Sequence, residues 1–233
     1  MEGKLVNPRF PQYIQGAYMI PKKNSAMLEP SPIESYFDGL RYFMALMFVI
    51  AIPPGLVFWF LIHPFIRLWR RIGAASTYMI TFGIMVLVGI GMYRIREIVL
   101  NRAYDMNWWV FAAGILLFSF SRIIAVQWRR KLKFGILFGF PELDPQGHPG
   151  VLLRDGIYGK IRHPRYTEGA LGLLGWSLIV QYPALYYLTL ASWIGIYFIV
   201  IIEERELRRR WGKEYEDYCA QVPRFFPKWP KTV

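Results

Sequence analysis

Cysteine is almost absent from this sequence. The chain has 233 residues and a single cysteine, Cys219. One cysteine excludes an intramolecular disulfide, and the lack of a CxxC or Cys/His ligand set argues against a structural zinc site. We therefore expect neither disulfides nor a metal ion to hold this fold together.

Acidic residues are also scarce, with 16 Asp and Glu against 28 Lys and Arg and a net charge of +12. In a soluble protein this excess would suggest nucleic acid as a partner, but no groove-reading motif or basic helix face accompanies it. Charge is also sparse over several long apolar runs: 55% of the residues are apolar, and the mean hydropathy is +0.25. This composition is typical of an integral membrane protein whose basic residues flank the spans.

Five apolar runs predict an all-α protein with about five membrane helices, at roughly 40–62, 77–92, 108–126, 167–181 and 184–202. Pro53-Pro54-Gly55 should kink or split the first helix. The second and fourth runs fall short of the ~20 residues that a straight helix needs to cross ~30 Å of hydrocarbon, so flanking residues should extend them. Only Tyr182-Pro183 separates the last two runs, which predicts a tight helical hairpin.

We divide the chain into three parts: an irregular N-terminal extension, three membrane helices, and a region with the last two helices and a polar tail, at 1–35, 36–126 and 127–233. The extension lacks the features of a signal peptide. Most Lys and Arg lie in the first–second loop, the third–fourth loop and the tail. This bias predicts a multi-pass protein with a cytosolic C terminus.

The polar tail also predicts helical structure. Glu204 and Glu206 each precede an arginine by four residues, a spacing that supports a continuous helix beyond the last apolar run. Gly212 is the expected stop, and a second short helix should follow it. These helices would form a cytosolic cap.

Chemistry-bearing residues cluster where the fourth apolar run begins, at Tyr158, Arg162, His163, Pro164 and Tyr166. Pro164 suits the first turn of a helix, whose free N–H groups offer a site for an anionic group. The hairpin should bring this cluster to the membrane face where the fifth run ends at Glu203-Glu204. Each residue alone has an ordinary explanation, as a helix cap, an interface tyrosine or helix-end solvation. Together they favour a site for a small zwitterionic ligand, since ionisable groups at such depth are costly.

Five motifs in order resemble the isoprenylcysteine carboxyl methyltransferase family, and phospholipid methyltransferases have a related arrangement: Gly156-x-Tyr158, Arg162-His163-Pro164-x-Tyr166, Glu203-Glu204, Trp211-Gly-Lys-Glu-Tyr215 with Tyr218, and Val222-Pro-Arg-Phe225. The resemblance covers about residues 147–227. Members of this family bind S-adenosylmethionine at the cytosolic end of such a hairpin, beneath the connecting segment and the tail. The resemblance therefore implies S-adenosylmethionine as cofactor.

Carried over by position, the resemblance implies cofactor contacts from Val151, Leu152, Leu153, Tyr158, Arg162, His163, Pro164, Tyr166, Glu203 and Glu204. Arg162, His163 and the helix N–H groups would take the methionyl carboxylate, and Glu203 the amine or ribose hydroxyls. Tyrosine faces would stabilise the sulfonium by cation–π attraction. No catalytic base is assigned, because methyl transfer to a carboxylate or thiolate relies mainly on alignment and desolvation.

The sequence departs from the family pattern at two positions. Ile199 stands where prenylcysteine enzymes carry an arginine that meets the substrate carboxylate, and Glu168 stands where the family favours glycine. Either Arg205 on the next turn replaces the missing arginine, or the acceptor is a thiol, an amine or a phenol. We favour the second explanation, because Arg205 should point further into solvent.

The sequence thus predicts an S-adenosylmethionine-dependent methyltransferase that acts in the lipid bilayer on a lipophilic or amphipathic acceptor, such as an isoprenylcysteine-like carboxylate or another small nucleophile. One alternative is an NADPH-dependent membrane reductase of the sterol reductase type, although no Gly-rich dinucleotide fingerprint is present. A second alternative is a non-enzymatic membrane scaffold, which would bind no nucleotide.

Overall fold

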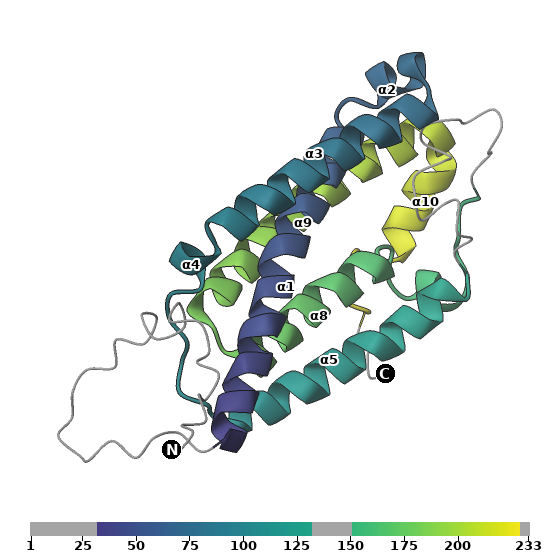
Figure 1. The fold of residues 1–233 in the computed structure, drawn as a ribbon. Coiled ribbons are helices and arrows are strands. Elements are labelled where there is room, and N and C mark those ends of the chain that lie inside the picture. Colours follow the sequence, from purple (N-terminus) through teal and green to yellow (C-terminus); the bar gives the residue numbers. More distant parts are fainter. Residues whose placement is uncertain (1–31, 132–150, 229–233) are drawn as a thin grey trace, which may run out of the picture.

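The computed structural model describes residues 32–131 and 151–228, and all regular structure in these ranges is helical. Five longer helices and several short ones follow one another along the chain: α1 (Pro32–Ile62), α2 (Ile66–Ile72), α3 (Ala74–Arg94), α4 (Arg96–Val99), α5 (Trp108–Arg129), the 3-10 turn η2 (Gly156–Gly159), α8 (Pro164–Val180), α9 (Pro183–Trp211) and α10 (Lys213–Gln221). The five longer helices run back and forth along the molecule (Figure 1). The predicted all-helical class is confirmed for these residues.

Helix α1 is continuous through Pro53 and Pro54, so of the predicted kink or split of the first span the split does not occur. A proline at position 54 cannot donate to the carbonyl of Ile50 one turn earlier. That carbonyl faces Gly89 of α3, where an added Cβ would lie 3.6 Å from it. Helix α3 therefore packs closely over the Ile50 carbonyl, which lacks its usual hydrogen bond. Neighbouring helices cover such carbonyls in other membrane helices that contain proline.

Helices α5 and α8 pack with their backbones in direct contact. A Cβ on Gly114 would lie 2.8 Å from the backbone N of Ile179, and one on Gly175 would lie 2.7 Å from that of Phe118. Small residues at these two positions therefore permit the pairing, as is common between membrane helices.

The predicted hairpin of α8 and α9 is present. Gln181 ends α8 in the left-handed conformation with φ 56°, and Pro183 begins α9 at a position that needs no N–H donor. Ser177 Oγ and Thr189 Oγ1 are 2.8 Å apart across the hairpin. At the closed end, Arg41 of α1 donates from Nε to the carbonyl of Val180 at 3.1 Å. The hairpin is thus fixed to α1 as well as closed on itself.

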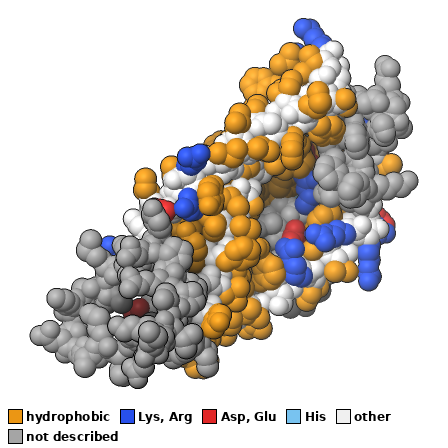
Figure 2. Space-filling model, viewed as in Figure 1, with side chains coloured by type: hydrophobic (Ala, Val, Ile, Leu, Met, Phe, Trp, Pro, Cys, Tyr) orange, Lys and Arg blue, Asp and Glu red, His pale blue; other side chains and the backbone are white. Residues whose placement is uncertain are grey.

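Four described helices are long and apolar enough to cross a membrane, namely α1 from Glu34, α3, α5 and α9. Large apolar side chains such as Phe82 and Leu87 are exposed on them, and hydrophobic side chains cover much of the described part of the face that Figure 2 shows. The chain is therefore a multi-pass membrane protein. Helix α8 has only 17 residues, and both its crossing and the cytosolic C terminus stay predictions.

The polar end of α9 follows the prediction closely. The helix continues past its apolar part to Trp211, Gly212 ends it with φ 52°, and α10 follows. The chain then returns to the start of α8, where the backbone N–H groups of Arg162 and His163 donate to Pro223 at 2.8 Å and Arg224 at 3.0 Å. The division into three parts stays a prediction. Most of the N-terminal extension and about half of the third–fourth connection lie outside the described residues.

Candidate functional site

The start of α8, the polar part of α9, the end of α1 and the C-terminal tail lie toward the same end of the molecule (Figure 1). Two groups of polar side chains occupy this end. One surrounds Glu204 and the other surrounds Glu203, the preceding residue of α9. Figure 2 shows charged side chains in a recess that apolar side chains border.

We call the first group the anchor cluster: Glu204, Arg162, His163, Arg208 and Arg224. Glu204 is fully buried. One of its oxygens is 2.8 Å from Arg162 Nη2 and 3.1 Å from His163 Nε2, and the other is 2.8 Å from Arg224 Nη2. Arg208, one turn further along α9, is 3.5 Å away. A carboxylate with this many cationic neighbours is compensated for its burial.

The anchor cluster joins the tail to the membrane hairpin. Arg162 Nη1 donates to the carbonyls of Cys219 at 3.0 Å and Val222 at 2.8 Å, besides its bonds to Glu204. The hydrogen bond to Glu204 raises the pKa of Arg224, so this guanidinium stays charged. Most donors of Arg162 are therefore already bound to protein groups, and the cluster holds the cap in place.

We call the second group the site cluster: Glu203, Tyr166, Arg165, Trp59 and His63. The Tyr166 hydroxyl donates to Glu203 Oε2 at 2.6 Å, and Arg165 Nη2 donates to the same hydroxyl at 3.0 Å. The Arg165 guanidinium lies 4.7 Å from the Trp59 ring centroid and 4.8 Å from that of Tyr166. Trp59 stacks on His63 with centroids 5.3 Å apart and planes at 19°.

His63 lies just beyond the last residue of α1 and is partly buried. Its Nε2 atom is buried and has no hydrogen-bond partner within the described residues. Burial lowers the pKa of His63 below its usual value of 6.5, against the opposing influence of Glu203 and Glu206 and together with that of Arg165. The imidazole is thus held in its neutral form, which has a lone pair to accept a proton or a hydrogen bond.

The predicted cofactor residues before α8 occupy different environments. Val151 is exposed, Leu152 packs against the buried side chains of α10, and Leu153 packs against the cluster that contains Tyr158. The Tyr158 carbonyl accepts a hydrogen bond of 2.7 Å from the Tyr218 hydroxyl. Burial raises the pKa of Tyr158, and it raises that of Tyr218 to about 12, so both phenols are neutral at physiological pH. Their predicted cofactor contacts are not tested.

The two residues predicted on the acceptor side differ sharply. Ile199 is 1% exposed and packs against Tyr166 in an apolar cluster with Val200. Arg205 is exposed and makes no hydrogen bond or ion pair within the described residues. The arrangement places an apolar side chain beside Tyr166 at the position where the family pattern has an arginine.

Glu168, the second departure from the family pattern, forms an ion pair with Arg122 of α5. Glu168 is buried, and Arg122 also lies 4.9 Å from the centroid of the Phe118 ring. A Cβ on Gly172 would lie 3.1 Å from the Arg122 guanidinium. Gly172 therefore leaves room for this pair, which connects α5 and α8 within the helical layer.

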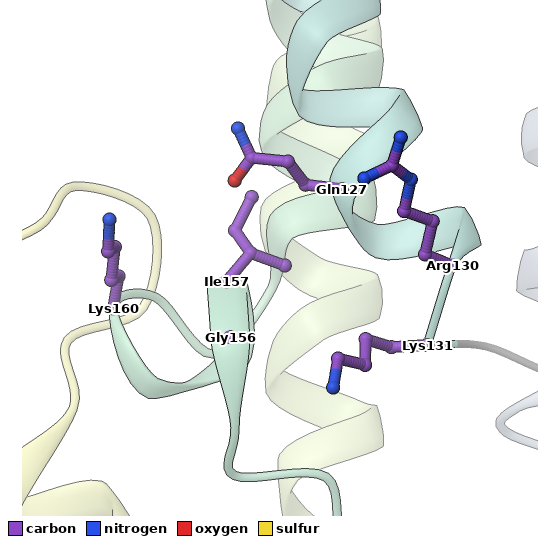
Figure 3. A pocket seen from close by; sticks show the side chains of 6 residues that line it. All are labelled: Gln127, Arg130, Lys131, Gly156, Ile157 and Lys160. Carbon is purple, nitrogen blue, oxygen red and sulfur yellow. The ribbon is translucent and has the colours of Figure 1, made fainter.

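A separate cavity of about 250 Å³ lies at the end of α5 and is lined by Gln127, Arg130, Lys131, Gly156, Ile157 and Lys160 (Figure 3). Lys131 pairs with Asp155, and this contact lowers the pKa of the Asp155 carboxyl. None of the residues of either cluster lines this cavity. No group of His, Cys, Asp or Glu that could hold a metal ion occurs in the described ranges.

Sequence reasoning missed Trp59 and His63, and it did not single out Arg224 within the Val222-Pro-Arg-Phe motif. Trp59 and His63 lie at the end of the first span, where an aromatic residue and a polar one are ordinary at a membrane interface. Only the packing of α1 against α8 and α9 reveals that both reach the site cluster. The Arg224 contact likewise depends on the path of the tail.

Comparison with known proteins separates the same two sets of residues, those found from the motifs and those that were missed. Residues 109–214 match the phospholipid methyltransferase family. This match confirms the resemblance to membrane methyltransferases that the motifs predict. The matching segment includes Arg165, Tyr166, Glu203 and Glu204, whereas Trp59, His63 and Arg224 lie outside it.

Two curated proteins are similar over a shorter stretch. The Delta(14)-sterol reductase LBR of Gallus gallus is 35% identical over 78 residues, which cover 31% of this chain and 12% of that protein. The Delta(14)-sterol reductase TM7SF2 of Mus musculus is 31% identical over 78 residues, which cover 31% of this chain and 18% of that protein. The aligned part is thus less than a fifth of each of these relatives. No solved structure matches the chain.

Proposed function

We propose that this protein is a membrane methyltransferase that uses S-adenosylmethionine and methylates a lipophilic or amphipathic acceptor at one face of the bilayer. The observation that carries this proposal is the Tyr166–Glu203 hydrogen bond of 2.6 Å within the segment that matches the phospholipid methyltransferase family. It places a carboxylate and a tyrosine ring at the end of the helical hairpin, next to the apolar surface.

The residues of the site cluster fit the chemical groups of S-adenosylmethionine. Glu203 Oε2 accepts from Tyr166, and its Oε1 has no hydrogen bond within the described residues. A carboxylate of this kind suits the ligand's ammonium group or ribose hydroxyls, and the rings of Tyr166 and Trp59 suit a sulfonium. When bound, S-adenosylmethionine would supply an electrophilic methyl carbon.

The chain's own contribution would be positioning and exclusion of water. Tyr166 and Arg165 hold the Glu203 carboxylate and the surrounding rings in place through the contacts of 2.6 and 3.0 Å. Ile199 and Trp59 line the cluster with apolar surface. Alignment of this kind, in a site with little water, accelerates a displacement reaction without acid–base help from the donor side.

Glu204 is better explained as the centre of the anchor cluster than as a direct ligand of the cofactor, because it is fully buried among protein cations. The same reasoning applies to Arg162, whose guanidinium binds Glu204 and two backbone carbonyls. Their role in the proposed function is to hold the cap and the start of α8, so that the site cluster keeps its shape.

The acceptor we favour is an amine, a phenol or a thiol. Ile199 offers no charge to a substrate carboxylate, and exposed Arg205 makes no hydrogen bond or ion pair with the described residues of the site cluster. An unpaired carboxylate near the membrane boundary would be costly to desolvate. A neutral nucleophile avoids this cost.

The test of the proposed function is a side-by-side titration of the detergent-purified protein with S-adenosylhomocysteine and NADPH. We expect S-adenosylhomocysteine to bind and to raise the melting temperature as its concentration increases, because a ligand of the native state stabilises it. NADPH at the same concentrations should do neither. Binding of neither ligand would contradict the proposal and favour a scaffold.

A second candidate function is an NADPH-dependent reductase, because both curated relatives described above carry the name Delta(14)-sterol reductase. A dinucleotide phosphate needs more cationic groups than one arginine beside Glu203 provides. If NADPH stabilises the protein and S-adenosylhomocysteine does not, this second candidate replaces the first.

A further inference from the structure

His63 is a polar group of the site cluster that the proposed positioning of the cofactor does not use. It lies at the junction of α1 and α2, between Ile62 and Ile66. Its ring stacks on Trp59, whose other neighbour is the Arg165 guanidinium at 4.7 Å. Its buried Nε2 atom has no partner in the described parts of the chain. A buried polar atom in this state calls for an explanation, and an absent ligand is one.

Each of the other candidate proton acceptors near the site has a protein partner or a proposed role towards the cofactor. His163 Nε2 lies 3.1 Å from Glu204, and Glu204 is surrounded by cationic groups. Glu203 accepts the Tyr166 hydroxyl, and its negative charge is suited to the cationic ligand. Within the described residues of the two clusters, His63 is the group that combines a neutral lone pair with an unoccupied nitrogen.

The surroundings of His63 keep it neutral. Burial is the main cause of its lowered pKa, and Arg165 of α8 acts in the same direction. Glu203 and Glu206 of α9 act in the opposite direction without reversing the effect. Trp59, near the end of α1, contributes an apolar face. A base of this kind is available at neutral pH and ready to become an imidazolium.

His63 and Trp59 also lie outside the segment that matches the phospholipid methyltransferase family. The matching segment supplies Glu203 and Tyr166, the proposed cofactor side of the site. The end of the first helix supplies Trp59, and His63 follows that helix directly. A feature particular to this chain's acceptor is therefore expected around the end of α1 rather than within the matching segment.

We propose that His63 Nε2 accepts the proton that the methyl acceptor loses, and that the acceptor is an amine, a phenol or a thiol. In this step the lone pair of the acceptor's N, O or S atom forms a bond to the methyl carbon. The bond from that carbon to the sulfonium sulfur breaks, and its electron pair stays on sulfur as S-adenosylhomocysteine forms. The acceptor's proton moves to His63 Nε2, and solvent later removes it.

This inference rests on the proposed function, and one experiment separates the two. The wild type and His63→Gln are compared in methyl transfer to an alkylphenol, an alkylamine and an alkylthiol. Acetylated farnesylcysteine serves as the carboxylate control, since it has no proton to lose at neutral pH. Phe65→Leu serves as the matched variant, because Phe65 is exposed and lies two residues from His63.

We expect His63→Gln to lower kcat by about 100-fold or more for an acceptor that must lose a proton, since this is the usual contribution of a general base. The wild-type pH profile should rise through the lowered pKa of His63 and then level off, and this rise should vanish in the variant. Affinity for S-adenosylhomocysteine should be unchanged in both variants. Phe65→Leu should behave like the wild type.

A second readout does not depend on turnover. The imidazole NMR signal of His63, assigned by its loss in His63→Gln, should titrate below pH 6.5. It should shift when the alkylphenol is added to protein already bound to S-adenosylhomocysteine.

The inference is overturned if the protein binds S-adenosylhomocysteine but His63→Gln keeps the wild-type rate and pH profile. It is also overturned if only the carboxylate control is methylated, or if no protonated acceptor is methylated or moves the His63 signal. Failure to bind S-adenosylhomocysteine at all is a different result, which rejects the proposed function itself.

Discussion

Glu203 and Glu204 are consecutive residues of α9, yet they belong to different clusters with different surroundings. Glu204 is fully buried and has contacts with three arginines and a histidine. Glu203 is partly exposed, and within the described ranges its carboxylate accepts one hydrogen bond, from the Tyr166 hydroxyl. Successive residues of a helix point about 100° apart, so one turns to the tail and the other to α1 and α8. Two identical side chains in one motif therefore need not share a role.

The largest expected effect is that of Glu204→Gln, which tests whether Glu204 holds the anchor cluster together. The change leaves Arg162 and Arg224 without the charge that compensates them, and breaking a buried ion pair of this kind typically costs about 3–5 kcal/mol. We expect a large fall in the melting temperature and in the yield of folded protein. Glu206→Gln is the control, because Glu206 and its partner Arg70 are partly exposed and such pairs contribute at most about 1 kcal/mol. Equal melting temperatures for the two variants would contradict the anchor role.

Glu203→Gln should produce the opposite pattern. It keeps the size of the side chain and removes its charge, so the cofactor loses a charge-assisted hydrogen bond worth about 1.5–3 kcal/mol. We expect affinity for S-adenosylhomocysteine to fall about 10- to 100-fold with little change in melting temperature. Calorimetric titration measures this directly. Unchanged affinity in a folded variant would show that Glu203 does not bind the cofactor and only solvates the polar end of α9.

Tyr166→Phe tests whether the Tyr166 hydroxyl positions the Glu203 carboxylate within the site cluster. The variant keeps the ring and removes the hydroxyl that positions Glu203 at 2.6 Å. A hydrogen bond of this kind contributes about 0.5–1.5 kcal/mol, so we expect a loss of affinity for S-adenosylhomocysteine of about two- to tenfold. Tyr197→Phe is a suitable control, because Tyr197 is exposed on the same helix as Glu203. A loss of the same size in both variants would contradict a positioning role for the Tyr166 hydroxyl.

The smallest expected effect is a pH dependence of stability from His63. Its pKa is lower in the folded protein than the usual 6.5, so the unfolded chain takes up the proton first as the pH falls. The contribution of neutral His63 to the free energy of unfolding is fully present above about pH 6.5. It is lost as the pH falls through the pKa of the folded state, by about 1.4 kcal/mol per unit of difference between the two pKa values. The unfolding free energy of His63→Gln should change less than that of the wild type between pH 7 and pH 5. Parallel curves would show that His63 is not held neutral.

The sequence predicted those parts of the fold that depend on local signals. Tyr182-Pro183 marked the hairpin and Gly212 marked the end of α9, because proline and glycine restrict or permit particular backbone angles. At Pro53-Pro54 the same local rules predict a kink or a split. The helix is not split, and contact with Gly89 of α3 supports its continuity.

The site was predictable to the extent that its residues lie in one motif or in paired helices. His163, Tyr166 and the two glutamates meet because the hairpin returns the chain to its starting face. The separate surroundings of Glu203 and Glu204 depend on tail and α1 contacts far away in sequence. Trp59, His63 and Arg224 were missed for the same reason, since no local spacing shows which distant helix they meet.

The most direct test of the account is an experimental structure of the protein with S-adenosylhomocysteine bound. We expect the ligand's amine or ribose hydroxyls to lie within hydrogen-bonding distance of Glu203, while Glu204 keeps Arg162, His163 and Arg224 as its partners. A ligand bound directly to Glu204, or bound at a distance from both α8 and α9, would contradict the division of roles between the two carboxylates.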